Sequence, residues 1–122
     1  SGTWYQVTDQ GAREGNYLES SATALFIYTL AKAINRGYIG NEYIEPTQKA
    51  FDGMVKTFTR LEEDGSYTIT NCCAVAGLGG DSKRYRDGSF EYYISEPIIE
   101  NDPKSVGSFI LAAIEYEKMT KK

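Results

Sequence analysis

The side chains that could do chemistry are concentrated between residues 72 and 108. This stretch contains the adjacent pair Cys72 and Cys73, a glycine cluster at 77–80, two arginines and several aromatic residues. These residue types could form a phosphate-binding loop, a thiol or metal site, or the edge of a binding cleft. The segment GLGGDSKR lacks the G-x-x-x-x-G-K-[ST] spacing and does not lead straight into a helix, so the sequence does not predict a phosphate-binding loop.

The cysteines do not predict a redox or metal site either. The chain contains no histidine, which removes the Ser–His–Asp and Cys–His mechanisms and most catalytic zinc sites. Neighbouring cysteines rarely form a disulfide with each other, because the local geometry is strained. Two adjacent thiols without histidine are also a poor metal site. We therefore expect Cys72 and Cys73 to be reduced and packed, and we expect this chain to bind no metal and no cofactor.

The composition narrows the class of partner. The 122 residues suggest one domain or a piece of one, with 41% hydrophobic and 25% charged residues. A net charge of −4 argues against nucleic acid as the main partner, since phosphate binding requires a basic face. No apolar run reaches the roughly 18 residues of a membrane span, so no membrane partner is expected. Ten tyrosines suit a surface that binds sugars or proteins, although each could equally be a half-buried packing residue.

Three helices must position these side chains. Residues 18–36 contain neither glycine nor proline and are apolar on nearly the whole circumference, and Gly37 follows as a C-terminal cap. Residues 42–62 carry one apolar stripe, with Pro46 in the first turns, which predicts a helix on the surface. Asp102 and Pro103 predict the start of a third helix that reaches about residue 118 and is again apolar nearly all round.

Two short segments between the helices predict strands. Residues 66–70 alternate and favour β-structure, and residues 89–95 are a second candidate. We expect them to pair as a small antiparallel ribbon, with the glycine-rich loop between them.

The order of buried helix, surface helix, ribbon and buried helix predicts a mainly α arc of an α/α barrel or toroid. Two helices that are apolar on all sides need more cover than three helices provide, and apolar side chains left open form an association-prone patch. We therefore expect the chain to self-associate in isolation, or to need the missing part of the ring.

Four segments of the chain carry a resemblance to a known family. They are GTWYQVTDQ (2–10), GNYLESSATALFIYTLAKAINRGYI (15–39), CCAVAGLGG (72–80) and YRDGSFEYYISEPIIENDPKSVGSFILAAIE (85–115). In this order they resemble the C-terminal portion of glycoside hydrolase family 105, the unsaturated rhamnogalacturonyl hydrolases related to family 88. The resemblance implies an (α/α)6 barrel of six inner and six outer helices. Residues 1–122 would be one C-terminal arc with a small β-ribbon, without the N-terminal helices.

The resemblance also implies the chemistry of the parent protein. Its substrate would be an acidic oligosaccharide that a polysaccharide lyase makes from pectin (rhamnogalacturonan) and that ends in a 4,5-unsaturated uronic acid. An aspartic acid would protonate the double bond at C4 and water would add at C5, after which the hemiketal opens and the leaving sugar departs. This remains general acid–base catalysis by a tuned carboxyl group. The family's catalytic aspartates lie in earlier helices, so we assign no catalytic residue to this chain, and a bacterial cytoplasmic or periplasmic protein is implied.

Residues at the starts of the two buried helices are candidate substrate contacts, because the cleft of such barrels lies at the N-terminal ends of the inner helices. Helix N-termini favour anions such as a uronate carboxylate. Lys104 and Ser105 begin one helix, with a solvated lysine as the alternative reading. Glu19 and Ser20 begin the other, with helix capping as the alternative.

Four further residues complete the candidate site. Trp4 and Tyr5 could stack on a sugar ring, or could instead close the floor or side of the barrel. Tyr85 and Arg86 lie on the loop between the two expected strands and could close over the cleft.

Two hypotheses from other functional classes can be weighed against the hydrolase. A non-catalytic carbohydrate-binding or scaffold module would fold alone and bind through its tyrosines. A toroid enzyme using thiol or metal chemistry would need histidine or spaced cysteines, and the sequence has neither.

Overall fold

The computed structural model describes residues 1–81 and 83–121. Its elements, in chain order, are α1 (Ser20–Asn35), the 3-10 helix η1 (Asn41–Tyr43), α2 (Ile44–Phe58), β1 (Thr59–Leu61), β2 (Tyr67–Ile69), β3 (Cys72–Cys73), α3 (Phe90–Ser95), β4 (Ile98–Ile99) and α4 (Pro103–Thr120).

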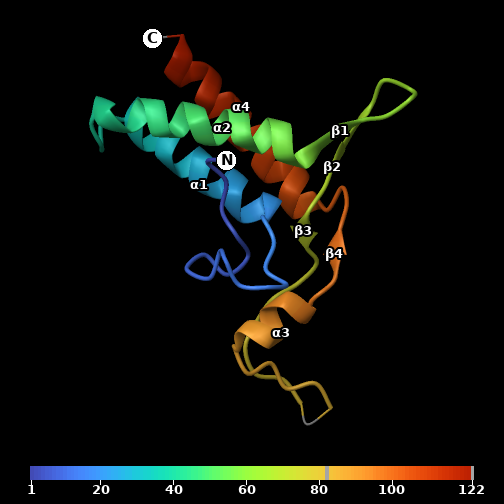
Figure 1. Ribbon diagram of the computed structural model, residues 1–122. Coiled ribbons are helices and arrows are strands. Elements are labelled where there is room, and N and C mark those ends of the chain that lie inside the picture. The colour runs from blue at the N-terminus through green and yellow to red at the C-terminus, as the bar shows by residue number, and fades with distance from the viewer. Residues whose placement is uncertain (82, 122) are drawn as a thin grey trace.

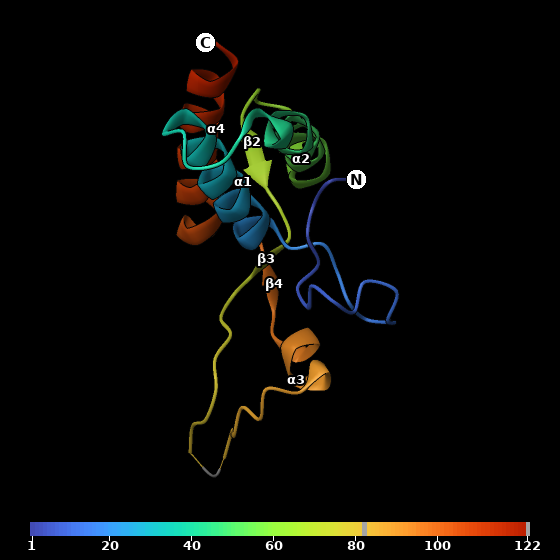
Figure 2. The ribbon, with the colours of Figure 1, turned by 90° about the vertical axis from the view of Figure 1, so that its left-hand side faces the viewer.

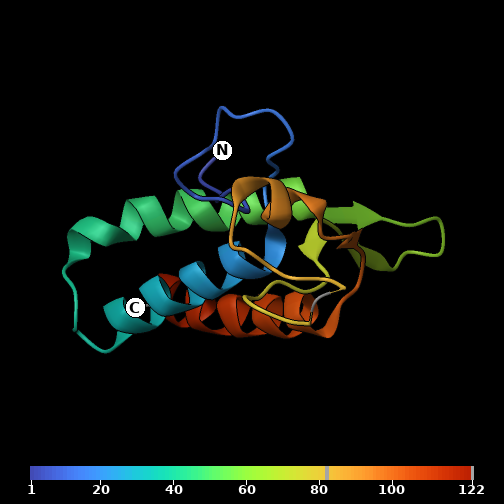
Figure 3. The same cartoon turned by 90° about the horizontal axis from the view of Figure 1, so that it is seen from below.

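The helices α1 and α4 lie side by side and run in the same direction, and α2 runs the opposite way along α1 (Figures 1 and 3). The β3–β4 ribbon and α3 lie beyond the end at which α1 and α4 begin (Figures 1 and 2), and the β1–β2 ribbon extends from the end of α2 (Figure 1). This arrangement agrees with the expected order of inner helix, outer helix and inner helix.

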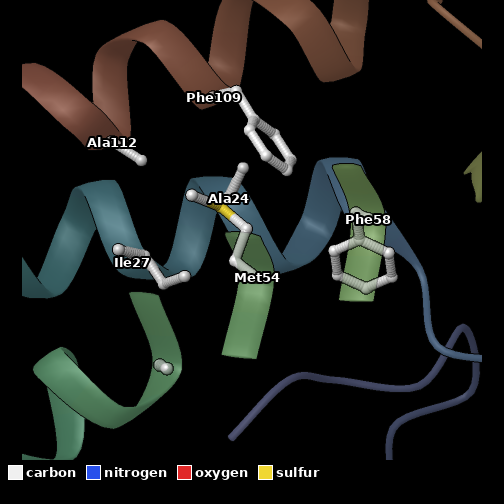
Figure 4. Close-up of a cluster of buried hydrophobic side chains, with 7 residues drawn as sticks. Ala24, Ile27, Met54, Phe58, Phe109 and Ala112 are labelled. Atoms are coloured by element: carbon white, nitrogen blue, oxygen red, sulfur yellow. The ribbon is translucent and has the colours of Figure 1, made fainter. Parts of the chain in front are cut away.

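The core lies where the three long helices meet (Figure 4). Ala24 of α1 and Ala112 of α4 have no exposed surface, and their small side chains let the two helices approach closely. Met54 and Phe58 fill the space on the α2 side and are also fully enclosed. Burying a side chain such as Phe58 stabilises the fold by about 1.5–3 kcal/mol relative to leaving it in water.

The first helix is close to the prediction of 18–36, and its C-terminus ends as predicted at Gly37. Gly37 has a φ of +69°, which glycine adopts without strain. Its N–H donates to the carbonyl of Ile34, and the Tyr38 N–H donates to the carbonyl of Ala33. This pair of bonds is a Schellman motif, which satisfies the last carbonyls of the helix.

The second helix is shorter than the predicted 42–62. After Phe58 the chain extends into β1, which pairs antiparallel with β2. Gly65, at a φ of +85°, turns the chain back between them. The strand pairing of 59–61 with 67–69 therefore ends the helix earlier than its apolar stripe indicated.

The prediction of a strand at 66–70 is confirmed by β2, but the predicted strand at 89–95 is wrong. That segment forms α3, because the Ser89 side chain accepts a hydrogen bond from the Tyr92 N–H and caps the helix. The partner of β2 is β1, and a second ribbon joins β3 to β4 with Cys72 opposite Ile99. Cys72 and Cys73 are buried and free, as expected.

The third helix begins as predicted. The Asp102 side chain accepts from the Lys104 N–H, and Pro103 occupies the first turn. The helix continues to Thr120, two residues beyond the predicted end.

Apolar side chains remain exposed on the sides of α1 and α4 that face away from the core. They are Leu25, Phe26, Ile110, Leu111 and Ile114. The sequence predicts that both helices are apolar nearly all round. These side chains are exposed because the three-helix arc covers only part of the circumference of each helix. Among the described residues, no helix is both long enough and apolar enough to cross a membrane.

A buried carboxylate fixes the start of α1. Glu19 is 1% exposed, and its Oε2 accepts from the Ala22 N–H at 2.7 Å. Its Oε1 accepts from the Ser21 hydroxyl at 2.8 Å and from the Cys73 N–H at 3.0 Å. Glu19 therefore caps α1 and ties the β3 ribbon to it.

Glu19→Ala is expected to lower the free energy of unfolding by about 3 kcal/mol, because it removes the cap and leaves the buried Cys73 N–H without an acceptor. Glu45→Ala, at an exposed glutamate in the first turn of α2, is the matched control and should change it by less than about 0.5 kcal/mol. Chemical denaturation measures both, and equal small losses would contradict the role of Glu19.

Candidate functional site

The N-terminal ends of α1 and α4 meet through two buried serines. The hydroxyls of Ser20 and Ser105 lie 2.6 Å apart, and neither residue has exposed surface. Cys72 lies beside them, and burial raises the pKa of its thiol. The structure thus brings together two predicted site residues that are 85 positions apart, and it joins them to each other.

Lys104 lies at the same end of α4 and is half exposed. Its Nζ donates to the Ala74 carbonyl at 2.9 Å and to Asp102 Oδ1 at 2.7 Å. The hydrogen bond with Asp102 raises the pKa of Lys104 and lowers the pKa of Asp102, so both groups are charged at neutral pH. An ammonium has three donors, and these two bonds leave one that can turn to a ligand.

Glu19 and the two serines have structural partners in the chain itself. The oxygens of Glu19 accept from α1 and from the β3 ribbon, and the Ser108 hydroxyl donates to the Ser105 carbonyl at 3.0 Å. Contact of Glu19, Ser20 or Ser105 with a substrate stays a prediction.

Trp4 lies against α1. Its backbone N–H donates to the Thr23 hydroxyl at 3.1 Å, and its ring meets Phe26 edge-on with centroids 5.1 Å apart. These two rings line an open hollow of about 360 Å³ together with Thr8, Thr29 and Leu30. An aromatic wall with hydroxyl groups suits the apolar face of a sugar ring.

Tyr5 is half-buried and packs its ring over Gly11, and its backbone pairs with Leu18. The Glu19 N–H donates to the Trp4 carbonyl at 2.9 Å, so the Trp4–Tyr5 segment is attached to the start of α1.

Tyr85 and Arg86 lie on the long loop between β3 and α3, which extends past the N-terminal ends of α1 and α4 (Figures 1 and 2). Arg86 and Gly79 exchange two backbone hydrogen bonds of 2.8 Å, which close the loop into a hairpin. Tyr85 is 69% exposed. The structure does not join these two residues to Lys104 by any contact among the residues it describes.

Glu96 is a residue that the sequence reasoning did not find. Its side chain is fully buried, and its Oε2 accepts from Arg84 Nη2 at 2.8 Å. In the sequence it is one of several glutamates near exposed turns, and only the folded chain shows that it is enclosed.

The predicted residues offer donors for an anion at Lys104 and Arg86 and, separately, an aromatic surface at the Trp4 hollow. Residues 1–81 and 83–121 contain no group of three or more cysteine, aspartate or glutamate side chains placed to hold a metal ion. Lys104 and Arg86 can each bind an anionic group, and the Trp4 hollow can hold the face of a sugar ring.

The chain is similar to two curated bacterial proteins. Protein Atu3128 of Agrobacterium fabrum and the 24.9 kDa protein in the picA locus of Rhizobium radiobacter are each 37% identical to it over 119 residues. The match covers 94% of this chain and 51% of each relative, so the chain spans about half the length of these proteins.

Solved structures are similar over the same range. A family 105 glycoside hydrolase of C. acetobutylicum matches with a TM-score of 0.90 and 46% identity, covering 94% of this chain and 31% of that chain. A structure described as a possible member of the GH105 family from Klebsiella pneumoniae matches with a TM-score of 0.73 and 26% identity, covering 99% of this chain and 27% of that one.

The family model described as Glycosyl Hydrolase Family 88 matches residues 1–120. The resemblance to family 105 and the expected arc of an α/α barrel are therefore both confirmed. This chain belongs to glycosyl hydrolase family 88, and its fold is an arc of the α/α barrel of the related family 105 hydrolases.

Proposed function

We propose that this chain is part of a glycoside hydrolase that releases a 4,5-unsaturated uronic acid from pectin oligosaccharides made by lyases. The observation that supports it most directly is the meeting of two parallel helix N-termini, with Lys104 charged and half exposed beside them. The dipoles of both helices and the Lys104 ammonium favour an anion at this end, and the substrate carries a carboxylate.

The proposed reaction hydrates the double bond of the terminal uronate. A carboxylic acid gives a proton to C4, water adds to C5, and the hemiketal then opens and expels the leaving sugar. In this proposal the residues of this chain bind and orient the substrate, whereas the aspartates that transfer protons come from other helices of the barrel. Lys104 and Arg86 meet acidic groups, and Trp4 supplies a stacking face.

The proposal also assigns a role to the exposed apolar sides of α1 and α4. In a complete barrel, further helices cover side chains such as Leu111 and Ile114, which are 44% and 45% exposed here. Where that cover is absent, a second copy of the chain covers them instead.

The activity can be tested with a matched pair of substrates. The full-length protein should cleave an oligosaccharide that ends in an unsaturated uronate, with loss of the ultraviolet absorbance of the double bond. It should not cleave the same oligosaccharide ending in the saturated uronate, because the saturated ring has no double bond to protonate. The 122-residue chain alone should be inactive on both.

Three results would contradict the proposal. Equal cleavage of both substrates would indicate a conventional glycosidase. Activity of the 122-residue chain alone would place catalytic groups within it. Binding of saccharides by the chain, without any cleavage by the full-length protein, would favour a non-catalytic carbohydrate-binding module.

Replacing Lys104 tests the anion site. Lys104→Met in the full-length protein should raise KM for the unsaturated acidic substrate about tenfold with little change in kcat, because it removes a charge-assisted hydrogen bond to bound substrate. Lys118→Met, on the same helix at its other end, is the control and should leave KM unchanged. Equal KM values of Lys104→Met and Lys118→Met for this substrate would show that Lys104 does not contact it.

The apolar surface predicts the behaviour of the 122-residue chain in solution. Light scattering should show self-association that increases with concentration, because the exposed side chains of α1 and α4 bury one another. The double variant Leu111→Gln, Ile114→Gln should reduce it, whereas Lys118→Gln on the same helix should not. A wild-type chain that stays monomeric at high concentration would contradict this prediction.

A further inference from the structure

The buried carboxylate of Glu96 lies between the two arginines of the long loop. Arg84 Nη2 donates to Glu96 Oε2 at 2.8 Å, and Arg86 Nε lies 4.0 Å from Glu96 Oε1. The Glu96 side chain has no exposed surface, whereas Arg84 and Arg86 are 61% and 31% exposed. A buried carboxylate is costly unless it is paired. The two arginines supply the positive charge for Glu96, and the Tyr92 hydroxyl lies within hydrogen-bonding reach of it.

The two arginines do not share the carboxylate equally. Arg84 makes a direct hydrogen bond, while the Arg86 contact is longer than a hydrogen bond. Among the residues that the structure describes, the Arg86 guanidinium donates no hydrogen bond to another group. A guanidinium has five N–H donors in a fixed fork that matches a carboxylate. Arg86 is thus held by charge, and its donors remain available.

The surroundings of Arg86 limit where its guanidinium can point. The backbone of Arg86 is fixed by its two bonds to Gly79, and Arg86 Nη1 lies only 3.2 Å from the position that a Cβ would take at Gly77. Gly77 is itself held, because its N–H donates to the Tyr92 hydroxyl at 3.1 Å. The backbone therefore bounds the group on one side and Glu96 attracts it on another.

We propose that Glu96 is a positioning residue, which orients Arg86 so that its free N–H groups receive a carboxylate of the acidic sugar. This inference rests on the proposed function, since it names the ligand class of the same site. Glu96 itself is buried and does not touch the substrate. It acts through Arg86, and the hydrogen bond from Arg84 keeps its carboxylate in place.

The proposed orientation of Arg86 by Glu96 predicts a different result from the Coulomb interaction alone. Removing a negative charge near an anion site should strengthen anion binding if only the Coulomb interaction matters. If Glu96 instead orients Arg86, then Glu96→Gln should weaken the binding of an acidic ligand although the site becomes more positive.

The test measures dissociation constants of the full-length protein for two ligands, an oligosaccharide ending in a uronic acid and its methyl ester. The wild type should prefer the acid, and both Arg86→Gln and Glu96→Gln should reduce this preference about tenfold. The double variant should match Arg86→Gln alone, because Glu96 acts only through Arg86. Glu91→Gln, an exposed glutamate on α3, is the matched control and should leave the preference unchanged.

Several outcomes would overturn the proposal. The first is a preference for the acid that is unchanged or increased in Glu96→Gln. The second is a double variant in which the effects of Arg86→Gln and Glu96→Gln add. The third is an equal loss of affinity for the acid and for its methyl ester, which a merely structural role of Glu96 would give.

A second measurement does not depend on the substrate. In NMR spectra, the Arg86 Nε–H resonance, assigned by its disappearance in Arg86→Gln, should be sharp in the wild type and broadened in Glu96→Gln. If it is unchanged in Glu96→Gln, Glu96 does not hold Arg86 and the inference fails. If that resonance broadens but the wild type does not prefer the acid, the proposed ligand class fails while the positioning by Glu96 stands.

Discussion

The close parallel packing of α1 and α4 is the constraint on which the rest of the structure depends. Parallel helices place both positive dipole ends together, and this arrangement needs negative charge nearby. The caps supply it, because Glu19 accepts from the first turn of α1 and Asp102 accepts from the first turn of α4. The 2.6 Å contact between Ser20 and Ser105 requires small side chains where the two helix starts meet.

The same constraint locates the candidate site. Because both helices begin at one end, the ribbon and the long loop that precede α4 must also gather there (Figure 1). Glu19 joins the ribbon to α1 through Cys73, and Lys104 joins α4 to the chain at Ala74. The Lys104 ammonium and the hairpin that carries Arg86 therefore lie beyond the starts of the same two helices.

Two buried glutamates perform different tasks in this arrangement. Glu19 has four donors from its own neighbourhood and so contributes to stability. Glu96 accepts from Arg84 and lies within hydrogen-bonding reach of the Tyr92 hydroxyl, whereas its contact with Arg86 is longer and leaves Arg86 with donors to spare. Sequence reasoning treated Glu19 as a possible contact and did not single out Glu96. Glutamate is usually exposed, and burial depends on segments far apart in the chain.

The sequence by itself determined the three long helices and the helix ends that carry caps, because caps and periodic apolar residues act locally. It therefore predicted the start of α4 at Asp102 and Pro103 and the end of α1 before Gly37. Residues 89–95 are short and aromatic, so local preference could not separate strand from helix. Tertiary structure decided that β1 pairs with β2, that Ser20 meets Ser105, and that Glu96 lies beside Arg86. The Ser20–Ser105 contact joins residues 85 positions apart, and each of the other two contacts bridges a loop, so none of them follows from the local preference of one segment.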